Sequence, residues 1–208
     1  MDLEIAADQE FEPKILYLIS KYSNVIENSY HEMELDTAEL FIKELPLMCL
    51  IYEAIVRKAI DYDYAPQSIL ITNFRMNANI SQEGVDDVND MRELGLIEKL
   101  QLTTKHHTII NGYKITDKGL EALKKLTDED RAPVDQIVYC NECRGLMELK
   151  IISQENKKKE DWYDLGDEEI KFVFACKENK THKFFESSFL DIEDVSYCSK
   201  EFYLDNFY

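Results

Sequence analysis

The sequence predicts an α+β protein with helices at its N-terminus, a central domain of helices and a hairpin, and a small β module at its C-terminus. Three observations support this fold class. Apolar residues recur every three or four positions up to residue 60, which is the period of an α-helix. Alternating β-type runs follow residue 95, and four of the five cysteines lie after residue 139. With 45% apolar and 11% aromatic residues among 208, the chain has the composition of a folded protein.

The N-terminal segment, residues 1–44, is expected to form a helical extension. Its apolar positions recur at helical spacing from Glu12 onward: Ile15, Leu16, Leu18, Ile19, Tyr22, Val25 and Ile26. Pro13 suits the first turn of this helix, where its missing N–H has no intrahelical partner to lose. A second helix is expected to begin near Asp36.

The central segment, residues 45–127, is expected to alternate helices with a hairpin. Its elements are helices over Leu47–Ile60, Gln67–Met76 and Ser81–Leu94, strands over Leu96–Leu102 and Ile109–Ile115, and a last helix over Leu120–Leu126. Ser81 or Asn79 caps the third helix, Gly95 ends it, and Thr116 opens the last helix. The expected core is Val85, Val88, Met91, Leu94 and Leu96 packed on Leu50, Ile51 and Ile55.

Two stretches of this segment resemble winged-helix regulators of the PadR and MarR type. They are MRELGLI, residues 91–97, and YKITDKG, residues 113–119. In that class a Leu-Gly-Leu-Ile end to the third helix is followed, after the wing, by Thr-x-x-Gly before the last helix. The resemblance covers about residues 45–126 and implies a winged-helix fold; it says little about function. The alternative is an unrelated small α+β domain with a hairpin.

After Thr127 the helical spacing of apolar residues gives way to a charged stretch and then to short β-type runs. Residues 128–133 are charged and are expected to form a linker, and residues 134–208 a zinc-ribbon-like β module with an acidic, aromatic tail. The β-type runs are Gln136–Cys140, Leu146–Ile152, Ile170–Cys176 and Lys183–Phe189. The tail either docks onto a basic, apolar groove of a partner or packs on the module itself.

The strongest chemical signal is the motif CNEC, residues 140–143. Two thiolates separated by two residues can bind one ion, because a tight turn brings both sulfurs to a tetrahedral centre. Cys176 and His182 suggest a second ligand pair, which predicts one Zn²⁺ bound by Cys140, Cys143, Cys176 and His182. Five residues separate the second pair, unlike the usual Cys-x-x-Cys, so Cys198 is an alternative fourth ligand. The remaining alternative is a set of unligated thiols.

The third helix of the central segment is poorly suited to DNA. It carries Glu83, Asp86, Asp87, Asp90 and Glu93 against Arg92 alone, whereas major-groove helices carry side chains that donate to bases and phosphates. The first four of these carboxylates are therefore predicted to bind a protein partner with a basic surface. The wing is different, because its four basic or titratable side chains can approach phosphates: Lys105, His106, His107 and Lys114.

The net charge and the absence of catalytic motifs in the sequence argue against several classes of function. The net charge is −18, with 2 basic and 10 acidic residues in 1–40 and 11 and 20 in 127–208, and this field repels nucleic acid and anionic membranes. No phosphate-binding glycine loop, nucleophile elbow or His-Glu-x-x-His motif occurs, so no enzyme activity is predicted.

No apolar run approaches the roughly 20 residues that span a bilayer. The acidic N-terminus is unlike a signal peptide, which predicts a cytoplasmic protein, or a nuclear one if its cell has a nucleus.

The predicted function is that of a non-enzymatic adaptor or regulatory subunit of a larger intracellular assembly. The alternative is a transcription-associated factor that binds DNA or RNA polymerase through the wing. A winged helix followed by a cysteine ribbon is similar in layout to the large subunit of transcription factor E, whose family contacts RNA polymerase and the open promoter. The likeness is one of domain order. The second ligand pair of this chain, Cys176 and His182, does not match a second Cys-x-x-Cys.

Overall fold

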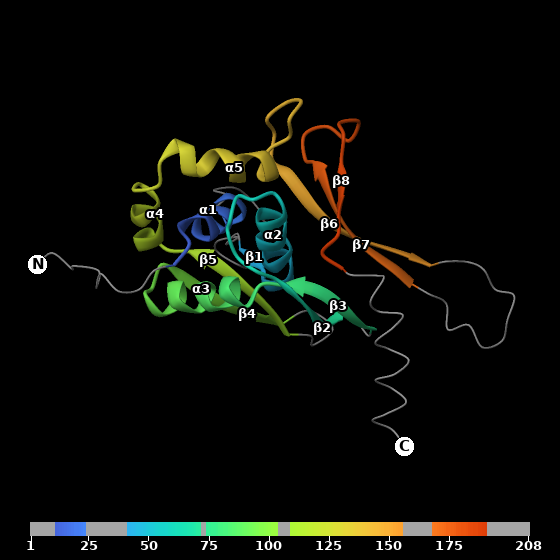
Figure 1. Ribbon diagram of the computed structural model, residues 1–208, viewed down its shortest axis with the longest axis horizontal. Coiled ribbons are helices and arrows are strands. Elements are labelled where there is room, and N and C mark those ends of the chain that lie inside the picture. Colours follow the sequence, from blue (N-terminus) through green and yellow to red (C-terminus); the bar gives the residue numbers. More distant parts are fainter. Residues whose placement is uncertain (1–10, 24–40, 72–73, 104–108, 156–167, 191–208) are drawn as a thin grey trace, which may run out of the picture. The chain divides into compact units, whose positions relative to one another are not determined.

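The computed structural model describes residues 11–23, 41–71, 74–103, 109–155 and 168–190, which form two compact units (Figure 1). Unit 1 comprises Met1–Asp63 and Ser81–Val138, and unit 2 comprises Tyr64–Ile80 and Tyr139–Tyr208. All the helices of the described residues lie in unit 1, whereas unit 2 is built from antiparallel strands. The expected α+β class, with small antiparallel sheets, is confirmed.

Helix α1 (Pro13–Tyr22) is the central helix of unit 1. It contacts four helices and one strand: α2 (Glu44–Val56), α3 (Gln82–Glu93), α4 (Asp117–Leu123), α5 (Asp128–Val138) and β5 (Ile109–Ile115). Every residue from Ile15 to Ser20 is buried, as expected of a helix surrounded by other elements. Residues 1–44, expected to form an N-terminal extension, thus include the helix at the core of this unit.

The sheet of unit 1 has the order β1-β5-β4, where β1 is Ile42–Lys43 and β4 is Ile97–Thr103. Strands β4 and β5 pair antiparallel with Ile97 opposite Ile115, which confirms the expected hairpin. The expected core is confirmed for Leu50, Ile51, Val88, Met91 and Leu96, which are buried. Val85, Leu94 and Ile55 are half-buried, so none of the eight side chains is exposed.

Helix ends in unit 1 follow the expected signals. The Ser81 hydroxyl accepts a hydrogen bond from the N–H of Gly84 at the start of α3, and the Thr116 hydroxyl accepts one from the N–H of Gly119 at the start of α4. Gly95 follows α3 with a φ of 69°, the left-handed conformation that a side chain disfavours.

Unit 2 contains a hairpin and a three-stranded sheet. Strand β2 (Ala65–Ile71) pairs with β3 (Phe74–Ile80), and β6 (Met147–Glu155), β7 (Glu168–Cys176) and β8 (Phe185–Ser187) pair in that order. The hairpin is joined to the chain after β8, because the Asn79 N–H donates to the Phe189 carbonyl at 2.8 Å. Phe172, Phe174 and Phe189 are fully buried and form the aromatic core, in which the Phe172 and Phe189 rings meet edge to face with centroids 5.1 Å apart.

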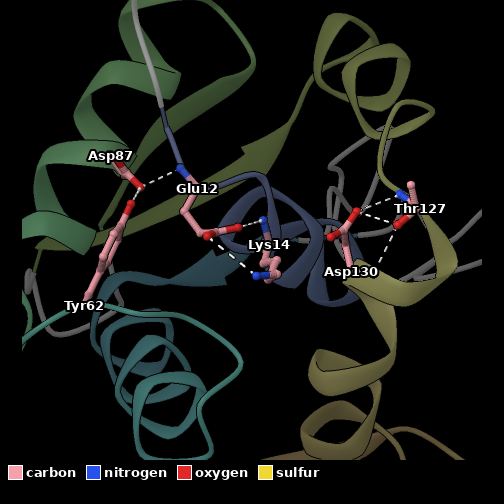
Figure 2. Close-up of polar contacts among 6 residues, drawn as sticks. All are labelled: Glu12, Lys14, Tyr62, Asp87, Thr127 and Asp130. Carbon is pink, nitrogen blue, oxygen red and sulfur yellow. Dashed lines mark hydrogen bonds and ion pairs between the residues drawn. The ribbon is translucent and has the colours of Figure 1, made fainter.

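Three expectations about the backbone are wrong. The short helix expected over Gln67–Met76 is the β2–β3 hairpin, because the apolar residues of β3 that face inward alternate with period two: Met76, Ala78 and Ile80. The linker expected over residues 128–133 and the strand expected at Gln136–Cys140 are replaced by α5. Its N-terminus is closed by reciprocal hydrogen bonds between Thr127 and Asp130, a capping-box arrangement (Figure 2).

Several predictions fall outside the described residues, namely the second N-terminal helix near Asp36, most of the wing tip and the acidic, aromatic tail. Among the residues that are described, no helix combines the length and apolar character needed to cross a membrane.

Candidate metal centre

The first loop of the candidate centre lies between α5 and β6 and carries Cys140 and Cys143. The N–H of Cys140 donates to the Gly145 carbonyl and the N–H of Arg144 donates to the Cys140 carbonyl, both at 2.8 Å. Arg144 adopts a φ of 60°, which closes the turn and lets the Gly145 N–H approach the Cys143 sulfur at 3.4 Å. This turn explains why both sulfurs face the same side.

The second loop connects β7 with β8 and carries Cys176 and His182. It is joined to the first loop by its backbone, because the Lys177 N–H donates to the Leu146 carbonyl at 3.0 Å. The two loops therefore lie at the same end of the β6–β7–β8 sheet (Figure 1). A turn with the His182 N–H donating to the Asn179 carbonyl returns the chain toward the cysteines.

The four predicted ligands come together at this end of the sheet. One ligand atom from each of Cys140, Cys143, Cys176 and His182 lies within 4.8 Å of the others. The Cys140 sulfur is 3.4 Å from His182 Nδ1, and the Cys143 sulfur is 3.5 Å from the Cys176 sulfur. Around a tetrahedral Zn²⁺ with Zn–S bonds of about 2.3 Å, two sulfurs are about 3.8 Å apart. The observed separations fit such an ion, so this cluster can hold a metal.

Asn179 determines which nitrogen of His182 faces the sulfurs. Its amide nitrogen lies 3.0 Å from His182 Nε2, which leaves Nδ1 turned toward Cys140. The amide itself is held by Thr181, whose N–H and hydroxyl both donate to Asn179 Oδ1 at 2.9 and 2.8 Å. Groups beyond the ligands that fix the imidazole in this way commonly tune metal affinity. The sequence pattern alone did not single out Asn179. The signal that could have identified it is a polar residue in the turn just before a candidate histidine ligand.

Two further contacts hold the loops against each other. Glu142 Oε1 accepts a hydrogen bond from the Lys183 N–H at 2.8 Å. Gly145 lies so close to the second loop that an added Cβ atom would be 2.5 Å from Glu178 Cγ. A side chain at position 145 would therefore require the Glu178 side chain to move.

The surroundings lower the pKa of two of the three cysteines and raise that of the third, Cys143, through its hydrogen bond with Cys176 and through burial. Hydrogen bonds lower the pKa of Cys140 to about 7, chiefly the one from the Cys143 N–H. Burial opposes ionisation of Cys176, but the Asn179 N–H and the Cys143 side chain lower its pKa on balance. Hydrogen bonds to the sulfurs of Cys176 and Cys140 raise the pKa of His182. Cysteine sulfurs beside an imidazole make a site for a soft cation.

Comparison with protein families gives one match. The model of the family described as "Uncharacterized protein MJ1567 family" matches residues 12–206. The chain belongs to the MJ1567 family. The match spans both units, including the four clustered ligands. Neither the curated proteins nor the solved structures contain a match to this MJ1567-family chain.

The other predicted ligand and most of the predicted wing lie outside the residues that the structure describes: Cys198, Lys105, His106 and His107. The remaining wing residue, Lys114, is half-buried, and its ammonium lies 3.6 Å from a Glu98 carboxylate oxygen. Part of its charge is therefore already neutralised on the hairpin.

The four predicted partner-binding carboxylates of α3 differ in their surroundings. Glu83 accepts a hydrogen bond from the Asp63 N–H, Asp86 is exposed, and Asp90 is half-buried. Asp87 does not belong to an outer acidic surface, because only 7% of the residue is exposed. The partner role of the four residues stays a prediction, and Asp87 is the one among them that is buried.

Asp87 instead joins three segments of unit 1. Its Oδ2 accepts hydrogen bonds from the Glu12 N–H at 2.8 Å and from the Tyr62 hydroxyl at 2.6 Å (Figure 2). Burial and then the Asp87 carboxylate raise the pKa of Tyr62, which keeps the phenol protonated as the donor. The carboxylate thus fixes the segment before α1 and the segment after α2 to α3.

Proposed function

We propose that unit 2 is a zinc-ribbon-like module that binds one structural Zn²⁺ through Cys140, Cys143, Cys176 and His182. The observation that carries this proposal is the approach of the four ligand atoms to within 4.8 Å of one another. Four protein ligands complete a tetrahedral shell, which is the arrangement of structural zinc sites, whereas catalytic sites keep one position for water or substrate. Two ligand loops at one end of a three-stranded antiparallel sheet also support a ribbon-like module.

The ligand types favour zinc over harder divalent ions. Thiolate and imidazole ligands suit Zn²⁺, whereas Mg²⁺ and Ca²⁺ require oxygen ligands. When bound, the ion would hold together two loops that otherwise depend on a few hydrogen bonds. Its role would be to stabilise the fold of unit 2.

A winged-helix arrangement is our proposal for unit 1. Helices α1, α2 and α3, the β4–β5 hairpin and α4 follow one another in the order helix, helix, helix, strand, strand, helix. In this assignment α1 is the first helix, and α2, which the sequence pattern made the first, is the second. The helix expected at Gln67–Met76 is no longer part of the three. The β2–β3 hairpin is then an insertion between the second and third helices, and it belongs to unit 2.

The function that this architecture supports best is that of a non-enzymatic adaptor or regulatory subunit of a larger assembly. The third helix, which a DNA reader would place in the major groove, exposes Glu83, Asp86 and Glu93 and half-exposes Asp90. These carboxylates repel phosphates and attract a basic protein surface. The alternative, DNA binding led by the wing, is disfavoured by the pairing of Lys114 with Glu98.

The adaptor proposal is tested with the full chain and one variant of α3. Affinity capture from the native cell should recover a basic protein partner, and Glu83→Gln, Asp86→Asn and Asp90→Asn together should release it. Glu129→Gln is the matched control, because Glu129 is an exposed carboxylate on α5. Equal capture by the triple variant and the wild-type chain would contradict the proposal.

A titration with duplex DNA at about 0.15 M salt, where screening acts over about 8 Å, tests the alternative. We expect no binding at micromolar concentrations. Micromolar binding that Lys105→Ala and Lys114→Ala abolish would replace the adaptor by a wing-led DNA binder.

A further inference from the structure

The end of unit 2 that carries the metal ligands also presents an exposed aromatic ring. Phe184 follows His182 by two residues and is 66% exposed, although Phe185 next to it stacks on Phe174 with centroids 4.6 Å apart. A single exposed apolar side chain is common on protein surfaces, so the role of Phe184 depends on the charged residues that the same loops carry.

Exposed cations lie on the same two loops as this ring. The two loops, residues 140–146 and 176–184, contribute four: Arg144, Lys177, Lys180 and Lys183. The same loops contain only two carboxylates, whereas the whole chain has 24 basic and 42 acidic residues. This end of the sheet therefore reverses the charge balance of the protein.

The two acidic residues lie near the contact between the loops. Glu142 accepts the Lys183 N–H, and the Glu178 side chain lies against Gly145. Both residues remain exposed, so the two loops carry four basic and two acidic side chains, and their balance is basic. We call the surface formed by Phe184, Arg144, Lys177, Lys180 and Lys183 the basic aromatic end.

We propose that the basic aromatic end binds single-stranded nucleic acid. In this arrangement an unpaired base stacks on the ring of Phe184, and the four cations contact the phosphates on either side of that base. Aromatic rings and cations on a fixed scaffold are the general means by which proteins hold single strands without reading their sequence. The inference rests on the proposed zinc site, because the bound ion is what would fix the two loops and the ring between them.

A single strand fits this surface better than the other anionic partners. A duplex keeps its bases stacked inside, so Phe184 would find no free base face. An acidic peptide matches the cations, but unlike a nucleotide it does not carry beside each charge a planar ring that could stack on Phe184. Long-range repulsion by the net charge of −18 is reduced by screening, which acts over about 8 Å at physiological salt.

The structure also sets the expected salt dependence. Each phosphate contact on a single strand contributes a slope of about −0.7 to the dependence of log K on log salt concentration, so four contacts give about −2.8. Binding without sequence recognition is weak at physiological salt, so we expect a dissociation constant on the order of 10⁻⁵ M.

The experiment is a fluorescence anisotropy titration of the full, zinc-loaded chain. The probes are 12-nucleotide oligouridine and oligothymidine, a 12-base-pair duplex, and poly-glutamate of matched charge. We expect both single strands to bind more tightly than the duplex and poly-glutamate. The two single-stranded probes distinguish RNA from DNA as the source of the ligand.

Two sets of variants separate stacking from charge. Phe184→Ala should weaken single-strand binding by about tenfold at every salt concentration, and Phe184→Tyr should retain it, because the ring supplies the stacking face. Lys180→Gln with Lys183→Gln should reduce the salt slope by about 1.4. The matched controls are Leu70→Ala, which removes an apolar side chain that is 65% exposed, and Lys125→Gln, which removes an exposed cation of unit 1. Neither control should change binding.

Zinc content, measured for every variant, distinguishes the failure of this inference from the failure of the zinc proposal. Two results with the zinc-loaded chain would refute the nucleic-acid site alone. One is binding of poly-glutamate as tight as binding of the single strands. The other is single-strand binding that Phe184→Ala leaves unchanged. The absence of detectable single-strand binding by the zinc-loaded chain at millimolar protein would also refute that site. A chain that takes up no zinc would refute the proposed metal site.

Discussion

Leu18 lies in the middle of α1, and none of its side chain is exposed to solvent. Replacing it with alanine removes three buried carbon atoms from a helix that four other helices and a strand surround. Leu18→Ala should therefore destabilise unit 1 strongly, although residues 1–44 were expected from sequence to form only an extension.

The magnitude follows from the burial. Truncation of a fully buried leucine to alanine costs about 2.7–5.0 kcal/mol, and the larger values apply where the surroundings cannot collapse into the cavity. Elements pack on α1 from several sides, so we expect a loss near the upper end, about 4 kcal/mol. For a unit of this size, a loss of about 4 kcal/mol lowers the thermal midpoint by roughly 15 °C.

Each unit can be followed by its own signal. All the described helices lie in unit 1, so far-ultraviolet circular dichroism during urea unfolding reports mainly on that unit. Co²⁺ substituted into the thiolate cluster absorbs visible light and reports on unit 2. Leu18→Ala should shift the helical transition to lower urea and leave the Co²⁺ spectrum of the folded protein unchanged.

The control is Leu120→Ala on α4, where the leucine is 44% exposed. It should change the unfolding free energy by less than about 1 kcal/mol, since the side chain is already half in water. A loss below about 1 kcal/mol for Leu18→Ala itself would show that α1 is not part of the core and would refute the fold described for unit 1.

Further predictions concern the cluster and the Asp87 network. Cys140→Ser should abolish tight zinc binding and unfold unit 2 while the helical signal of unit 1 persists, as metal titration and circular dichroism will show. Zinc affinity of the wild-type chain should fall as the pH drops below about 7, because the Cys140 thiol, with its pKa lowered to about 7, regains its proton there and competes with the metal. Asn179→Ala should retain one zinc equivalent but weaken its binding by about 10- to 100-fold in a chelator competition. Asp87→Ala should destabilise unit 1 by about 2–4 kcal/mol in urea, because the Glu12 N–H and the Tyr62 hydroxyl lose a charged acceptor, whereas Asp86→Ala should stay within about 0.5 kcal/mol.

The metal cluster was predictable because its signals are local and chemical. A Cys-x-x-Cys turn places two sulfurs together, and β-type runs on each side of Cys176 and His182 bring the second pair to the same sheet end. The choice of His182 over Cys198 is supported by the position of its Nδ1, 3.4 Å from Cys140, while Cys198 lies outside the described residues. The contribution of Asn179 was not visible from sequence, because it depends on the shape of the turn.

Helix ends were predictable for the same reason. Ser81, Gly95 and Thr116 act within three residues of their own positions, so tertiary contacts do not override them. The reciprocal Thr127–Asp130 pair is also such a signal, and a helix start at residue 128 could have been inferred from it.

Two other errors arose where distant contacts decide the structure. The apolar residues at 69 to 80 fit a helix or a hairpin, and pairing of Ala65–Ile71 with Phe74–Ile80 selects the hairpin. Asp87 looks like any other carboxylate of an acidic helix. Only the approach of Tyr62 and of the Glu12 N–H makes it a buried acceptor.

The zinc content of the purified protein, combined with X-ray absorption at the zinc edge, tests the central proposal most directly. We expect one equivalent of zinc per chain with three sulfur ligands at about 2.3 Å and one nitrogen ligand at about 2.0–2.1 Å. Four sulfur ligands would transfer the fourth position from His182 to another cysteine. A metal-free protein with an ordered β6–β7–β8 sheet would contradict the account and leave Cys140, Cys143 and Cys176 as unligated thiols.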